Sequence, residues 1–372
     1  MDYTKWANDT MKRIISKLEI TATEIGVSFP HAAKEGVYNC EGSQFWTNGF
    51  WPGILWIAFQ ETQNEKFANV AKEIEKEMDG VLDGFELLDH DMGFMWLLSS
   101  GANYMINGDN QSRIRLLKAS SHLAGRFNPK GNFIRAWNWK TGQMIIDCMM
   151  NLPLLYWASD EIQDPRFAHI AEAHVETVLK YSIRPDSSVN HILEFDPQNG
   201  EFLNSLAGQG AAADSAWSRG TAWALYGLAL AYRYFKKEEI LTSCKNVANF
   251  FLANLPEDNV SHWDFRVERN SSTPRDTSAA ACAACGLLEL SEHLPEGERE
   301  MYMKRAYLIL RSLTDNYSNL DNNAQQSILS GATGAFPQKE NINVGLIYAD
   351  YFYVEGISRL CGNKEIFWYG HL

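Results

Sequence analysis

The chain has little cysteine for its size, with six residues in 372, at positions 40, 148, 244, 282, 285 and 361. Disulfide frameworks belong to short secreted chains, so none is expected here. Cys282 and Cys285 have the spacing of a metal or redox motif, but they lie in the small-residue run 278–288, which predicts a tightly packed helix. Because no second CxxC pair or nearby pair of histidines completes a zinc site, we interpret them as two small buried residues and expect no metal.

Positive charge is also scarce, since 33 Lys and Arg face 46 Asp and Glu and leave a net charge of −13. Nucleic acid and anionic membranes need a basic surface, so neither is an expected partner. An acidic small molecule would need a local cationic patch. The N-terminal stretch contains Lys12, Arg13 and Lys17 and no apolar core of signal-peptide length, which predicts a cytoplasmic protein.

Linkers, low-complexity tracts and strand signals are nearly absent. The simplest interpretation is one domain that spans residues 1–372. The one strand signal is the run 191–195 before the turn-forming segment 196–200, which predicts a short hairpin over one mouth of the fold.

Helical patterns fill most of the chain and repeat. Residues 63–71 and 163–171 share a pattern, and each opens a charged amphipathic helix that follows an apolar, Trp-bearing helix. The same alternation recurs around 92–126, 221–255 and 277–313, and a sixth apolar helix begins near Tyr348. Six apolar helices inside six amphipathic ones satisfy burial by closing into a ring, so we predict an all-α (α/α)6 barrel. An open solenoid of the HEAT type is the competing architecture.

Unusual polar and aromatic residues stand at the starts of the apolar helices. If these helices alternate with outer ones, they run parallel, and their N-termini meet at one end of the ring. Carboxylates, arginines, a histidine and tryptophans there have the composition of a pocket for an acidic sugar, because Arg binds carboxylates and Trp stacks on sugar rings. The residues are Trp46, Asn48, His90, Asp91, Asp147, Arg219, Trp223, Arg275 and Asp276.

Asp147 is the first candidate for catalysis, because apolar residues flank it in the run 144–157. A carboxylate in such surroundings is either paired or has a raised pKa, which suits a group that gives and takes a proton. The alternative is a plain N-cap for the following helix. We expect Asp91 to lie beside Asp147 and to raise its pKa by like-charge repulsion, or else to act as a simple N-cap. Local capping and pairing is the favoured interpretation for Arg275 and Asp276.

At these residues the chain resembles the unsaturated glucuronyl hydrolases, bacterial enzymes of glycoside hydrolase family 88. The matching segments run in order over most of the chain, and they are specific only together. They are WTNGFW (46–51) with GILW (53–56), DHDMGF (89–94), IIDC (145–148) with NLPLL (151–155), FDP (195–197) with NG (199–200), WSRG (217–220) with AW (222–223), and PRDTSA (274–279).

The resemblance implies the same barrel and removal of the Δ4,5-unsaturated uronic acid that lyases leave at the non-reducing end of glycosaminoglycan fragments. It implies that Asp147 protonates C4 of the vinyl ether and then, as a carboxylate, activates water for attack at C5, with no metal or organic cofactor. Asp91 would hold the ring hydroxyl groups. The residues implied to bind the substrate and its carboxylate are Trp46, His90, Trp137, His191, Gln209, Arg219 and Trp223, although a lone loop histidine such as His191 is equally often structural.

One segment departs from the family pattern. Streptococcal members that favour sulfated fragments carry a Ser-x-x-Ser-x-Lys stretch before the last inner helix, whereas residues 334–343 read GAFPQKENIN here. The departure argues against a preference for sulfated sugars, although Arg135 or Lys339 could still bind an anion.

Other functions stay open from the sequence. They are hydrolysis of unsaturated rhamnogalacturonyl units from pectin on the same barrel, a sugar epimerase that uses His90 and His191, and a non-catalytic sugar-binding or scaffold protein. The expected partner is the unsaturated oligosaccharide alone, and the expected assembly is a monomer or a weak dimer.

Overall fold

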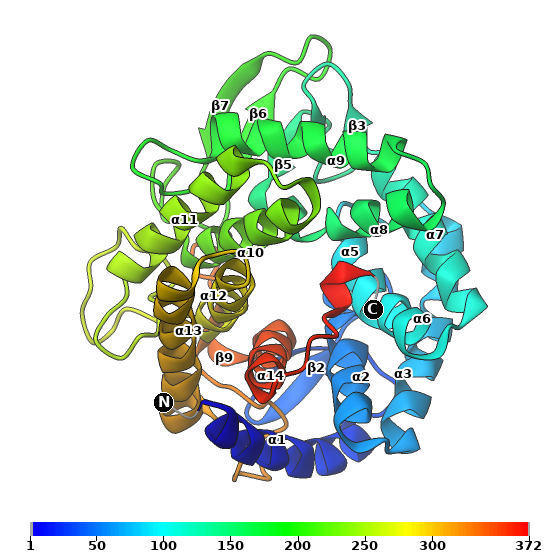
Figure 1. Cartoon of the computed structure of the whole chain (residues 1–372), viewed down its shortest axis with the longest axis vertical. Coiled ribbons are helices and arrows are strands. Elements are labelled where there is room, and N and C mark those ends of the chain that lie inside the picture. The colour runs from blue at the N-terminus through cyan, green and yellow to red at the C-terminus, as the bar shows by residue number, and fades with distance from the viewer. Residues whose placement is uncertain (1–2, 371–372) are drawn as a thin grey trace.

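The computed structural model describes residues 3–370, which form a double ring of helices (Figure 1). Apolar helices make the inner ring, and each packs against amphipathic helices of the outer ring. The inner positions are α2 (Phe50–Thr62), α5 (Met92–Trp96) continued by the π-helix η1 (Leu97–Gly101) and α6 (Ala102–Asn107), α8 (Pro153–Glu161) after the 3-10 helix η2 (Ile146–Met150), α10 (Ser218–Phe235), α12 (Thr277–Ser291) and α14 (Ile347–Cys361). The outer positions are α1 (Tyr3–Ile25), α3 (Glu65–Glu77), α7 (Asn110–Ala124), α9 (Arg166–Thr177) with η3 (Val178–Ser182), α11 (Glu238–Ala253) and α13 (Glu296–Tyr317). The predicted (α/α)6 barrel is confirmed.

The two rings differ in burial as their sequences predict. Every residue of α12 is buried, and its Ala and Cys side chains allow close packing on both neighbours. In the outer helix α3, by contrast, only one stripe is buried, formed by Phe67, Ala68, Ala71, Ile74 and Glu75. Cys282 and Cys285 are free and buried inside α12, and the Cys285 thiol donates to the carbonyl oxygen of Phe352 at 3.0 Å.

Small sheets supplement the helices at the site end of the ring, and the sequence predicted only part of one. The expected hairpin exists as β6 (Ile192–Phe195) and β7 (Phe202–Leu206), and β5 (Gln143–Ile145) adds a third strand. A four-stranded sheet in the order β2-β1-β9-β8 and the pair β3-β4 were missed. Their strands are β1 (Pro30–Lys34), β2 (Val37–Cys40), β3 (Phe127–Asn128), β4 (Phe133–Ile134), β8 (Ala332–Ala335) and β9 (Glu340–Leu346).

Two physical reasons explain the missed sheets. Strands such as β8, with the sequence ATGA, have almost none of the β-branched and aromatic residues that mark a strand. The pairing of β1 with β9 joins Ala32 to Leu346, a contact between distant parts of the chain that no local pattern encodes.

The C-terminal segment closes the middle of the ring. The 3-10 helix η4 (Phe367–Tyr369) lies near the ring centre in Figure 1, close to the end marked C. Trp368 is buried there, stacks on Phe352 at 6.1 Å between ring centroids, and donates from its indole nitrogen to Glu355 Oε2 at 2.8 Å. Among residues 3–370, the structure has no helix with both the length and the apolar character needed to cross a membrane.

Close approach between inner elements depends on glycine at several positions. A Cβ atom at Gly227 of α10 would lie 2.5 Å from the Cβ atom and 3.0 Å from the carbonyl carbon of Met149 in η2. Met149 belongs to η2, the short helix that also carries Asp147. This contact therefore sets the distance between α10 and the candidate site.

We therefore expect Gly227→Ala to lower the free energy of unfolding by about 1 to 3 kcal/mol, the usual cost of overpacking a dense core. Urea denaturation followed by circular dichroism measures it. Gly297→Ala in α13 is the control, because a Cβ atom there meets nothing within 4 Å. Equal stabilities for the two variants would contradict the close packing of α10 on η2.

Candidate active site

A cavity of about 370 Å³ lies at the N-terminal ends of the inner helices. Two residues were predicted to be catalytic and seven to bind the substrate. Eight of these nine line the cavity, namely Trp46, His90, Asp91, Trp137, Asp147, His191, Gln209 and Arg219. They come from separate segments: Trp46 precedes α2, Asp91 precedes α5, Asp147 lies in η2, and Arg219 lies in the first turn of α10. The prediction that the inner helix starts meet at one end of the ring is confirmed.

Asp147 does not act as the cap of the next inner helix. The chain leaves β5 at Ile145, and Asp147 lies in the first turn of η2, whereas α8 begins at Pro153 with Leu152 in its N-cap position. Asp147 Oδ2 is buried and has no hydrogen-bond partner within residues 3–370. Buried polar atoms are nearly always satisfied, so an open acceptor at a cavity wall indicates a place for a ligand.

His191, the residue just before β6, faces this open acceptor. Its Nδ1 accepts a hydrogen bond from the backbone N–H of Gln209 at 2.9 Å, so in the neutral ring the proton is on Nε2. Nε2 lies 3.5 Å from Asp147 Oδ2, a contact that can tighten when a substrate binds. Gly208 makes this approach possible, because its φ is +58° and a Cβ atom there would lie 2.2 Å from His191 Nδ1.

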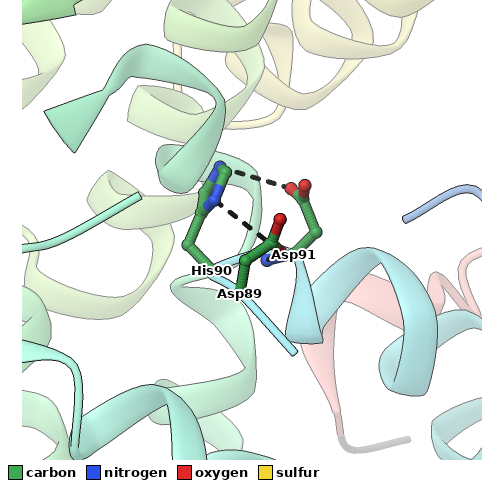
Figure 2. A group of neighbouring side chains, drawn as sticks. All are labelled: Asp89, His90 and Asp91. Atoms are coloured by element: carbon green, nitrogen blue, oxygen red, sulfur yellow. Dashed lines mark hydrogen bonds and ion pairs between the residues drawn. The ribbon is translucent and has the colours of Figure 1, made fainter. Parts of the chain in front are cut away.

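His90 has the opposite arrangement. Its Nδ1–H points to the carbonyl oxygen of Ala136 at 3.1 Å, which leaves a lone pair on Nε2. Nε2 faces Asp91 Oδ1 at 3.4 Å (Figure 2), and it is buried without another partner among the described residues. A lone pair that faces a carboxyl group favours the protonated acid, which can donate to it.

The electrostatics of the two carboxyl groups follow these arrangements. Burial raises the pKa of Asp91 well above its ordinary value, and the charges of Asp89 and Asp147 raise it further. Burial also acts to raise the pKa of Asp147, but His191, His90 and Arg219 outweigh it and hold that pKa below its ordinary value. The expectation of a raised pKa for Asp147 is therefore wrong for the free protein, in which Asp91 is the carboxyl group with the raised pKa and Asp147 the one with the lowered pKa.

Asn151 connects the carboxyl group of Asp91 to the backbone of Asp147. Its side-chain nitrogen donates to Asp91 Oδ1 at 3.1 Å and to the backbone oxygen of Asp147 at 3.4 Å, while its side-chain oxygen accepts from the N–H of Phe94 at 2.9 Å. No role for Asn151 is predicted from the sequence. Its place in the matching segment 151–155 was the only signal available.

Arg219 provides the positive charge of the cavity, but most of its hydrogen-bond donors are occupied. Nη1 donates to Asp276 Oδ2 at 2.7 Å and to the carbonyl oxygen of Thr333 at 2.6 Å. Nη2 donates to the carbonyl oxygen of Gly334 at 2.5 Å and to Gln209 Oε1 at 3.4 Å. Arg219 therefore attracts an anion mainly by its charge. The amide nitrogen of Gln209, whose oxygen faces Arg219, is left as the donor on the cavity side.

Two aromatic predictions have different outcomes. Trp46 lines the cavity and packs on Tyr348, with ring centroids 5.0 Å apart, and Trp137 lines it from the loop after β4. Trp223 is not in the lining. It is fully buried among Phe94 and Phe352, at 5.1 and 5.4 Å, and this corrects the expectation that it contacts a sugar. Its position in the second turn of α10, below Arg219, directs the ring into the core.

The comparisons with known proteins agree with this geometry. Residues 20–354 match the sequence model of Glycosyl Hydrolase Family 88. This chain belongs to that family. It is 36% identical over 364 residues to the unsaturated chondroitin disaccharide hydrolase of Streptococcus pneumoniae (strain ATCC BAA-255 / R6), an alignment that covers 96% of this chain and 92% of the relative.

Solved structures show the same relationship. The crystal structure of unsaturated glucuronyl hydrolase from Bacillus sp. GL1, described as responsible for the degradation of glycosaminoglycan, superposes with a TM-score of 0.93 at 33% identity over 99% of both chains. A variant of the Streptococcus agalactiae enzyme complexed with dGlcA-GalNAc6S superposes with a TM-score of 0.87 at 32% identity, over 97% of this chain and 93% of that one. Glycosidase is therefore the enzyme class of this family 88 chain.

The interpretation of local capping and pairing holds for the cap that Asp276 forms, but Asp276 also pairs with Arg219 of another inner helix. Asp276 is the N-cap of α12, where its Oδ1 accepts from the N–H of Ser278 at 3.1 Å, and its other oxygen pairs with Arg219. Arg275 points to the carbonyl oxygen of Val260 at 2.9 Å and to Asp258 at 3.2 Å. Arg135 and Lys339 are not among the lining residues, whereas Gln338 and Glu340 are.

Asp89, His90 and Asp91 have ligand atoms within 4.8 Å of one another, the spacing of a possible cation site (Figure 2). Asp89 Oδ1 already accepts from the N–H of Asp91 at 2.9 Å, and His90 Nδ1 is committed to Ala136. These contacts compete with a metal, so the family 88 chain is still expected to need none.

We expect EDTA to leave the thermal midpoint of the purified protein unchanged and elemental analysis to find no stoichiometric metal. Differential scanning fluorimetry with and without EDTA, followed by re-addition of Ca²⁺, Mn²⁺ or Zn²⁺, gives the measurement. A midpoint that falls with EDTA and recovers with one cation, but does not respond in Asp89→Asn, would show that this cluster holds a metal.

The raised pKa of Asp91 also predicts a pH-dependent stability. Because Asp91 binds its proton more tightly in the folded than in the unfolded chain, raising the pH above the unfolded value of about 3.9 costs the folded state free energy until the folded pKa is passed. Asp91→Asn removes this cost, so its stability relative to wild type should improve steadily as the pH rises above about 4. Urea denaturation at several pH values measures the trend.

Asp147→Asn is the matched control. The pKa of Asp147 is depressed, so its contribution to stability is present above the unfolded value and is lost as the pH falls, which gives this variant the opposite trend. A constant difference between Asp91→Asn and wild type over the whole range would contradict the raised pKa of Asp91.

Proposed function

We propose that this protein, as a single catalytic domain, removes the Δ4,5-unsaturated uronic acid from the non-reducing end of oligosaccharides that a polysaccharide lyase has released, chiefly fragments of the chondroitin and hyaluronan type. The observation that carries the proposal is the geometry of the cavity wall, where Asp91 and Asp147 each face a histidine, at 3.4 and 3.5 Å, and the two histidines have opposite tautomers. Hydration of a vinyl ether needs one proton donor that becomes a base, and Asp147 supplies it.

Substrate binding provides the proton at the required place. An anionic sugar beside Asp147 adds negative charge and displaces water, and both effects raise the pKa of this carboxyl group. Asp147 then takes up a proton from solvent as the substrate binds, while Asp91, with Asn151 beside it, makes hydrogen bonds to the sugar hydroxyl groups. The charge of Arg219 and the amide of Gln209 attract and orient the uronate carboxylate.

The reaction then balances with water as the only co-reactant. Asp147 gives its proton to C4, and positive charge develops at C5 and the ring oxygen. The Asp147 carboxylate next takes a proton from water as the water oxygen bonds to C5, which restores the acid. The hemiketal then opens, the C1–oxygen bond to the remaining sugar breaks, and that sugar is released. Because no covalent glycosyl-enzyme forms, the separation rule for paired glycosidase carboxylates does not apply to Asp91 and Asp147.

An unsulfated sugar next to the uronate fits the cavity best. Glu340 and Gln338 line it from the turn between β8 and β9, where a sulfate would meet a carboxylate. Lys339 lies between them in sequence and does not line the cavity.

The test is the ultraviolet absorbance of the C4=C5 double bond, recorded with unsaturated hyaluronan, unsulfated chondroitin, 6-sulfated chondroitin and pectin disaccharides. We expect wild type to remove the absorbance fastest with the unsulfated glycosaminoglycan substrates. Asp147→Asn should lower kcat by roughly 10²- to 10⁴-fold, the range for loss of a general acid–base group, with substrate binding largely retained.

Asp164→Asn is the matched control, because Asp164 precedes α9, does not line the cavity and pairs with its neighbour Arg166. Full turnover by Asp147→Asn, or no loss of absorbance with any disaccharide and wild type, would refute the proposal. Fastest turnover of the pectin disaccharide would instead assign the rhamnogalacturonyl reaction.

A further inference from the structure

Trp139 is exposed to an unusual degree. Its side chain is 74% exposed, the largest fraction among the exposed large hydrophobic residues of the described chain. Large aromatic residues bury themselves unless something prevents it, so an exposed indole needs a physical reason. The ring of Trp139 lies 6.4 Å from that of Trp137, with 19° between their planes. Trp137 in turn lines the catalytic cavity.

Hydrogen bonds of Asn138 and Arg126 fix the loop that carries the two tryptophans. Asn138, which lies between them, accepts from Arg126 Nη1 at 2.7 Å and donates to the carbonyl oxygens of Glu86 and Leu88 at 2.9 and 3.0 Å. Arg126 is itself buried and donates from Nη2 to the carbonyl oxygen of Ala136 at 2.8 Å. Trp139 is therefore exposed on a fixed backbone, and its ring has little freedom to fold onto the core.

The cavity is too small for a long substrate. Its volume of about 370 Å³ is at the lower end of the range of about 300 to 1,000 Å³ for ligand sites. The reacting uronate occupies the deep end beside Asp147, so the sugars on its reducing side must leave past the rim. Trp137 and Trp139 extend from the cavity wall to solvent, nearly parallel to each other, as a continuous aromatic surface.

We propose that Trp139 forms an additional sugar-binding subsite that holds the second or third residue on the reducing side of the scissile bond in substrates longer than a disaccharide. The C–H face of a pyranose stacks on an indole, and a rigid ring loses little entropy on binding. The inference rests on the proposed function and deepens it, because it names oligosaccharides of four or more units as substrates that the protein binds more tightly than disaccharides.

The experiment compares unsaturated hyaluronan disaccharide with the tetrasaccharide, using wild type, Trp139→Ala and Trp139→Phe. For Trp139→Ala, the loss of kcat/KM on the tetrasaccharide should exceed the loss on the disaccharide by about 3- to 10-fold, the value of one aromatic stacking contact, and it should appear in KM. Trp139→Phe keeps an aromatic face and should recover most of this difference. Met301→Ala is the control, since Met301 is a 45% exposed apolar side chain on the outer helix α13.

Three outcomes would overturn the subsite. Equal losses on both substrates would show that Trp139 only supports the loop. No loss on either would show that the indole binds nothing from the substrate. A wild-type dimer in light scattering that becomes monomeric in Trp139→Ala would show that a second copy of the chain covers the ring.

A failure of the proposed function looks different, because wild type would then leave the disaccharide unchanged. Calorimetry with the tetrasaccharide tests the subsite independently of turnover. Asp147→Asn should bind it about 3- to 10-fold more tightly than Asp147→Asn combined with Trp139→Ala.

Discussion

The buried ion pair of Arg219 with Asp276 is the interaction on which the rest of the structure depends. Arg219 is 2% exposed and Asp276 is fully buried, so each charge needs the other. Asp276 also caps α12, and Arg219 binds two carbonyl oxygens of β8 and stacks over Trp217 at 4.6 Å. Removing one member of such a pair leaves an uncompensated buried charge, which typically costs about 3 to 5 kcal/mol. One guanidinium thus joins two inner helices, a sheet and the wall of the cavity.

The same cation affects the pKa values of the carboxyl groups at the cavity. It helps to lower the pKa of Asp147, while burial, together with the charges of Asp89 and Asp147, raises the pKa of Asp91. The two histidines reinforce this difference because their backbone contacts fix opposite tautomers. A ligand that brings a negative charge disturbs this balance at Asp147, so substrate binding and the protonation of Asp147 are coupled. In the free protein, therefore, the pKa of Asp147 has not yet been raised by a bound substrate.

Several features were predictable because they depend on local sequence. The alternation of apolar and amphipathic helices predicted the ring, and the polar residues at the apolar helix starts predicted the end where the cavity lies. The relation between Asp147 and Asp91 was predicted only in part, because the sign of a pKa shift depends on every neighbour. His191, His90 and Arg219 come from segments far apart in sequence, and their combined effect reversed the expectation from burial alone. The burial of Trp223 was missed for a similar reason, since helix phase decides which side of α10 a ring occupies.

The sequence by itself determined the helical repeat, the net acidic charge and the end of the ring at which the cavity lies, because periodicity and composition are local properties of the chain. Only the tertiary structure decided which carboxyl group has the raised pKa and how many hydrogen-bond donors of Arg219 are already occupied. It also decided that the loop after β4 carries an aromatic surface from the cavity into solvent. These properties depend on distances between segments that are close only after the ring closes, and electrostatic and packing energies change steeply with such distances.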